Sequence, residues 1–109
     1  MTTISFSPAA EDIFSVRKAI YRMIIIRATK ELEHSEDIKE LEMSELFDDM
    51  SLYSLPEAQR ARLQAALLAG TSTLQADIIT GRPTEEPTLA GINEKLNELI
   101  EFMRAHIAA

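Results

Sequence analysis

The chain has 109 residues, a formal net charge of −7, no cysteine and a 46% share of hydrophobic residues. These values exclude an intrinsically disordered chain, disulfide bonds and cysteine-based metal or nucleophile chemistry. This length supports a single modest core, so we expect one helical domain over residues 1–109. The longest apolar run, Met23–Ile26, is far below the ~20 residues that a membrane span needs, and no basic and apolar leader opens the chain. We therefore expect a soluble, cytoplasmic protein.

The negative charge is concentrated in one segment. Residues 31–49 hold nine acids against one lysine, a net −8, whereas the remaining ten basic and nine acidic residues leave +1. Just before this acidic segment, residues 13–30 hold five basic residues and no acid. The distribution disfavours direct nucleic-acid binding, which needs a basic footprint, and favours a basic protein partner.

The first helix is expected to begin at Ser7–Pro8, because serine is a preferred N-cap and proline is favoured at the first helical position. On a helical wheel, most of its apolar residues fall in one arc roughly 200° wide, which is too broad for a helix with one wet face. These residues are Ile13, Phe14, Val16, Ile20, Tyr21, Met23, Ile24, Ile25, Ala28 and Leu32. The helix therefore needs neighbours on at least two sides. No β-branched alternation is evident, so no strand is expected.

Two arginines, Arg17 and Arg27, lie inside this apolar arc. In the preferred interpretation their aliphatic stems run along apolar surface while the charges reach water, and Arg27 pairs with Glu31 one turn on. In the other interpretation they point at acids on another helix or chain.

A second helix is expected after a break or bend near His34, with Ser35 or Asp37 as its N-cap. Alternatively the first helix continues, because Ile38, Leu41, Leu46 and Met50 stay in phase with its apolar arc. Residues 51–56 are expected to form a turn.

The third helix should begin near Ser54 and Glu57, which have the spacing of a capping box, and run to about Thr80. Gly81 should end it in the left-handed conformation, with Pro83 preventing continuation. It carries large residues on one side and a stripe of small residues on the other, which we expect to admit a close helix. The small residues are Ala58, Ala61, Ala65, Ala69, Ser72 and Ala76.

The last helix is expected over Thr88–Ile107. Its apolar residues form one clean stripe with near-heptad spacing, which indicates a nearly parallel or antiparallel partner helix. They are Leu89, Ile92, Leu96, Leu99, Ile100, Met103 and Ile107. The expected fold class is thus all-α: a small antiparallel bundle of four helices, with the second helix short or continuous with the first.

Catalytic signatures are absent from the sequence. Glu31 and His34 have the spacing of a di-iron ligand pair, but Met103 stands where a second pair would need a carboxylate before His106. No serine lies in a glycine-flanked elbow, and the three glycines are too far apart for a phosphate loop. We expect no catalytic residue, no metal site, no cofactor and no enzymatic activity.

The acidic segment is the candidate partner-binding surface, with apolar residues just after it as anchors. The candidate residues are Glu36, Asp37, Glu40, Glu45, Asp48, Asp49, Phe47, Leu52 and Tyr53. Two plainer interpretations together carry more weight. The acids either form a solvated helix face, or they are neutralised internally when the second helix folds back on the basic run.

The functional hypothesis is a non-enzymatic acidic binding protein that inhibits or occludes a more basic partner, such as a toxin domain. This describes an immunity or antitoxin protein, with neither nucleic acid nor membrane as a direct partner. The alternative is a homo-oligomeric helical regulator or scaffold, for example a homodimer, in which the first and last helices form the self-interface.

Overall fold

The computed structural model describes residues 1–85 and 91–107, and it corrects the expected fold class. The described chain is mostly helical, but it also contains a three-stranded mixed sheet, so it is not an all-α bundle. The helices are α1 (Lys18–Ala28), α2 (Ser35–Phe47), α3 (Glu57–Ile79) and α4 (Ile92–Ile107). The strands are β1 (Thr2–Ser5), β2 (Ile13–Val16) and β3 (Asp49–Ser51).

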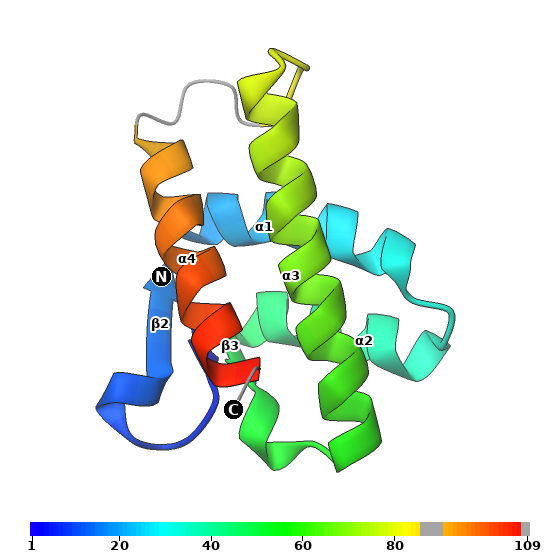
Figure 1. The fold of residues 1–109 in the computed structure, drawn as a ribbon. Coiled ribbons are helices and arrows are strands. Elements are labelled where there is room, and N and C mark those ends of the chain that lie inside the picture. The colour runs from blue at the N-terminus through cyan, green and yellow to red at the C-terminus, as the bar shows by residue number, and fades with distance from the viewer. Residues whose placement is uncertain (86–90, 108–109) are drawn as a thin grey trace.

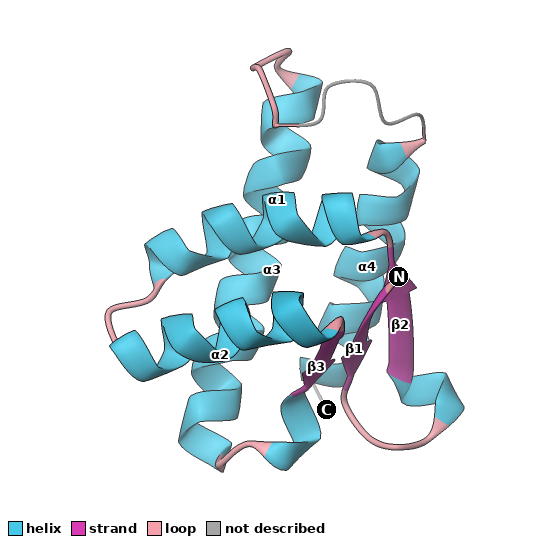
Figure 2. Ribbon diagram, turned by 180° about the vertical axis from the view of Figure 1, so that it is seen from behind, coloured by secondary structure: helices cyan, strands magenta, loops and turns pink. Residues whose placement is uncertain are grey.

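The helices are arranged as two crossed pairs. Figure 2 shows α1 and α2 lying side by side and crossing in front of the α3/α4 pair, with the sheet at one end. Helices α3 and α4 run in opposite directions along each other (Figure 1), so the partner helix expected for the last helix is α3, and it is antiparallel. Four of its stripe residues are buried: Leu96, Leu99, Ile100 and Met103. Its expected start at Thr88, and Leu89, lie outside the described residues.

The sheet replaces the first half of the expected first helix. Strand β1 is central, pairing antiparallel with β2 and parallel with β3, so that Ile4 faces both Phe14 and Met50. The expected helix start at Ser7–Pro8 is wrong. Ser7 instead belongs to the β1–β2 connection, where its Oγ donates to Asp12 Oδ2 at 2.6 Å. Strand pairing overrides local helix signals here because it buries Ile4 and Val16 completely.

The break near His34 is confirmed, and α1 and α2 pack side by side. Neither Ser35 nor Asp37 caps α2, because His34 is its N-cap residue and no side chain caps the helix. Between the two helices, the buried Tyr21 hydroxyl lies 2.6 Å from Ser44 Oγ. Ser44 donates to the Leu41 carbonyl, so Tyr21 is the donor to Ser44. Burial raises the pKa of Tyr21, which therefore stays protonated.

Helix α1 is covered on several sides, as its wide apolar arc requires. Met23–Ile25 are buried, whereas Ile26 is partly exposed on the polar side. The closest cover is α3, whose Gly70 backbone lies so near that an added Cβ would be 2.8 Å from the Ile24 carbonyl oxygen and 2.9 Å from the Ala28 nitrogen. The helix pair thus crosses at a residue that has no side chain.

The predicted role of the small-residue stripe on α3 is wrong. Ala58, Ala61, Ala65 and Ala76 are exposed, and the close approach uses Gly70 on another face. The capping box is also wrong, because Ser54 Oγ donates to the Ser51 carbonyl and Pro56 is the N-cap.

The C-terminal end of α3 follows the expectation. Gly81 has a φ of 75° just beyond the last turn, which is the left-handed conformation expected there.

Candidate functional site

The acidic segment is partly neutralised by the basic run of α1. Arg22 Nε lies 2.7 Å from Glu45 Oε1, and Lys18 Nζ lies 3.2 Å from Asp48 Oδ1. Both pairs form because α2 folds back along α1. For Glu45 and Asp48, the interpretation of internal neutralisation is therefore the one that fits.

Asp37 is not a surface residue. Its side chain is 0% exposed and receives two hydrogen bonds from Arg62 of α3, from Nε to Oδ2 at 2.6 Å and from Nη2 to Oδ1 at 3.1 Å. These bonds hold the pKa of Asp37 below its ordinary value. A buried carboxylate needs such a partner, so Asp37 joins α2 to α3 and leaves the set of candidate contact residues.

The other candidates differ in exposure. Leu52 is fully buried and also leaves the set. Four candidates are exposed: Glu36, Phe47, Asp49 and Tyr53. Three are partly exposed: Glu40, Glu45 and Asp48.

An exposed apolar cluster on the last turns of α2 comprises Met43, Leu46 and Phe47, and only Phe47 was anticipated. Leu46 is 69% exposed and Phe47 is 66% exposed, while Leu41 on the opposite face is fully buried. The alternative in which the first helix continues, with Leu46 in phase with its apolar arc, is wrong, because α2 has its own axis and its own buried face. A signal was present, because Met43, Leu46 and Phe47 have the spacing of one helix face, away from Leu41. We call these three residues the α2 apolar cluster.

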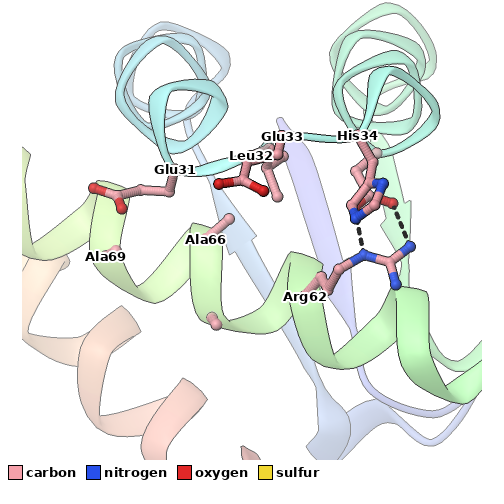
Figure 3. Close-up of a pocket in the computed structure, with 9 residues that line it drawn as sticks. Glu31, Leu32, Glu33, His34, Arg62, Ala66 and Ala69 are labelled. Carbon is pink, nitrogen blue, oxygen red and sulfur yellow. Dashed lines mark hydrogen bonds and ion pairs between the residues drawn. The ribbon is translucent and has the colours of Figure 1, made fainter.

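A pocket of about 410 Å³ opens between α3 and the connection from α1 to α2 (Figure 3). Glu31, Glu33 and His34 line it from the connection, and the Asp37–Arg62 ion pair lies at one end. The carboxylates of Glu31 and Glu33 take part in no hydrogen bond or ion pair with other described residues. We call this the α1–α2 pocket.

Glu31 and His34, the residues with di-iron spacing, therefore line one pocket. Within residues 1–85 and 91–107, however, no group of three or more acidic or histidine side chains is close enough to hold a metal ion. The described residues thus offer no built metal centre.

Arg27 does not reach solvent along an apolar stem, so the preferred interpretation was wrong. It is only 8% exposed, and its Nε donates to Asp77 Oδ2 at 2.9 Å while Nη1 donates to Glu85 Oε1 at 2.8 Å. Nη1 also donates to the Met23 carbonyl of its own helix. Arg27 thus joins α1 to the end of α3 and to the segment after it.

A further polar cluster joins α4 to the β1–β2 connection. His106 Nδ1 lies 2.8 Å from the Phe102 carbonyl and Nε2 lies 2.8 Å from Asp12 Oδ1. Both ring nitrogens face acceptors, so the protonated ring satisfies both. The hydrogen bond to Phe102 and the contact with Asp12 raise the pKa of His106. The hydrogen bonds from Ser7 and His106 lower the pKa of Asp12.

Comparison with known proteins adds no identity. No protein-family model, no curated protein and no solved structure matches the chain. In the described part of the chain, no helix is both long and apolar enough to cross a bilayer.

Proposed function

We propose that this chain is a non-enzymatic acidic binding protein that occludes a more basic protein partner, in the manner of a cytoplasmic immunity protein or antitoxin. The observation that carries the proposal is the α2 apolar cluster, with Leu46 69% and Phe47 66% exposed on a helix that also displays acids. Large apolar side chains ringed by charges are the usual construction of an interface anchor.

The acids displayed along α2 and at the start of β3 support a basic partner. Glu36, Glu42 and Asp49 are exposed, and Glu40 is partly exposed. The contact surface is accordingly narrower than the set expected from sequence, since Asp37 and Leu52 are buried. In this mechanism Leu46 and Phe47 enter an apolar depression of the partner while the acids pair with its basic rim and speed the encounter.

The alternative, a homo-oligomeric regulator or scaffold, is supported at a different place from the one first expected. The apolar faces of α1 and α4 are covered within the chain, so they offer little self-interface. The α2 apolar cluster could instead pair with a second copy. A light-scattering mass at about 50 mM and about 500 mM salt separates the two candidates, because screening weakens charge pairing and leaves an apolar dimer intact. A dimer at both salt concentrations favours the alternative, and a monomer favours the inhibitor.

The inhibitor proposal is tested by co-expression with the product of each gene that flanks its own. We expect one product to slow growth, the wild-type chain to bind it and restore growth, and a Leu46→Asp/Phe47→Asp variant to lose both effects. Ile79→Asp is the matched control, because Ile79 is an equally exposed apolar residue on α3. Protection that survives in the α2 variant, or two flanking products that neither bind nor slow growth, would count against the proposal.

A further inference from the structure

We infer that the α1–α2 pocket receives a lysine or arginine side chain from the basic partner. This inference deepens the proposed function and depends on it for the source of the side chain. It adds a second point of contact with the partner. This second point lies at the acidic N-terminal end of α2, whereas the α2 apolar cluster lies at the C-terminal end of the same helix.

The pocket has an apolar floor beneath a charged wall. Ala65, Ala66 and Ala69 of α3 form the floor, and Leu32 contributes from the connection above. Figure 3 shows Glu31 and Glu33 in the space between that connection and α3. An extended basic side chain has the same two parts, because its aliphatic stem is apolar and only its end is charged.

The charges around the pocket favour a cation. Arg62 and His34 are the basic side chains that line it, and Asp37 pairs with Arg62 at 2.6 Å and 3.1 Å. Glu36 also approaches Arg62, at 3.5 Å. With Arg62 engaged by Asp37, the carboxylates of Glu31 and Glu33 leave the pocket negative, and neither of them pairs with a cation among the described residues. These two groups repel an anionic occupant, and a neutral one could gain only hydrogen bonds to them, without the charge attraction that a cation adds.

The size and position of the pocket also suit a side chain. About 410 Å³ accommodates the end of a long side chain, and the opening lies at the molecular surface, where Glu31, Glu33 and His34 are all exposed. Glu36 links the pocket to the exposed face of α2, because it is exposed itself and reaches Arg62 on the pocket wall.

The test uses a defined probe and does not need the partner. The ¹⁵N-labelled protein is titrated with N-acetyl-arginine methylamide and, separately, with N-acetyl-norleucine methylamide, which has an apolar stem without the charge. We expect saturable shifts confined to residues 31–37 and 62–69 with the arginine probe, and none with the norleucine probe. Spermidine is the third titrant, because a free polyamine carries the same kind of cation.

Three variants locate the binding. Glu31→Gln/Glu33→Gln should weaken binding of the arginine probe about tenfold, because two exposed charge interactions of ordinary strength are removed. Glu40→Gln/Glu42→Gln makes the same charge change elsewhere on the acidic segment and should alter affinity by less than about twofold. Ala65→Leu fills the pocket from an exposed position without changing charge, and should abolish the saturable shifts.

Three results would overturn the inference: no saturable shift with the arginine probe, equal weakening in both double variants, or binding of spermidine alone. The inference and the proposed function fail separately. The proposed function fails in co-expression, when the Leu46→Asp/Phe47→Asp variant still protects, whereas the pocket fails in the probe titration, whatever the result of co-expression.

Discussion

The backbone of Gly70 on α3 touches that of Ile24 on α1 so closely that a Cβ at Gly70 would lie 2.8 Å from the Ile24 carbonyl oxygen. The neighbouring atoms are backbone atoms, which cannot move aside as a flexible side chain can. The helix crossing that buries Met23–Ile25 therefore depends on a glycine at this position.

Gly70→Ala should destabilise the fold even though alanine is the better helix former. The atoms that the new Cβ would meet are backbone atoms, so we take the upper part of the overpacking range, about 2–3 kcal/mol; the ~1 kcal/mol gained in helix propensity then leaves a net loss of about 1–2 kcal/mol. Urea unfolding followed by circular dichroism measures it. Ser72→Ala on the same helix serves as the control and should be nearly neutral, and an unchanged midpoint for Gly70→Ala would contradict the close crossing.

Asp77→Ala should cost more than a surface ion pair is worth, because Arg27 is largely buried and would lose one of its two carboxylate partners. We expect a loss of about 1–3 kcal/mol in the free energy of unfolding. Arg82→Ala is the matched control, since Arg82 meets the same Asp77 only at 3.6 Å and from an exposed position. It should cost less than about 0.5 kcal/mol. The free energy of unfolding of both variants is measured by thermal and by urea unfolding. Equal losses for Asp77→Ala and Arg82→Ala would show that burial of Arg27 contributes nothing.

The His106–Asp12 contact should make stability depend on pH. The folded-state pKa of His106 is raised above its ordinary 6.5, so its contribution is full below about pH 6.5 and is lost as pH rises through the folded pKa. The pKa of Asp12 is lowered from 3.8, so its contribution is present above that value and is lost as pH falls through the folded pKa. The pair should therefore contribute most to the free energy of unfolding between about pH 3.8 and pH 6.5.

The pH prediction is measured on His106→Gln. The difference in unfolding free energy between wild type and variant should be larger at pH 5.5 than at pH 9. NMR titration of the His106 ring gives its pKa directly, and Asp12→Asn should lower it. A ring pKa at or below 6.5 in the wild type would refute the arrangement.

Leu41 and Leu46 lie on the same short helix but face opposite environments. Leu41→Ala should cost about 2–5 kcal/mol, because it opens a cavity in the core. Leu46→Ala should change stability by less than about 0.5 kcal/mol, as expected for an exposed position. Thermal unfolding of the two variants compares them directly, and a large loss for Leu46→Ala would mean that the α2 apolar cluster is needed for folding and is not a contact surface.

Several features could be read from the sequence because they depend on residues near one another in the chain. The end of α3 at Gly81, the bend near His34 and the buried stripe of α4 follow from turn chemistry and helical spacing. The fold-back of α2 onto the basic run is of the same kind, because a short connection makes neighbouring helices pack together. Internal neutralisation of the acidic segment was one of the interpretations that the sequence left open, and Glu45 and Asp48, which were named as contact candidates, are the residues to which it applies.

The remaining features depend on contacts between distant parts of the chain. Strands β1 and β2 contain only four residues each, and β1 is completed by β3, 46 residues further on, which no local pattern announces. Arg27 and Asp37 became buried ion-pair residues because Asp77 and Arg62 arrive from α3. Leu41 packs in the core, and this decides which face of α2 is left exposed. Local spacing thus determined where helices end, while long-range packing decided which charges are buried and which apolar residues remain for a partner.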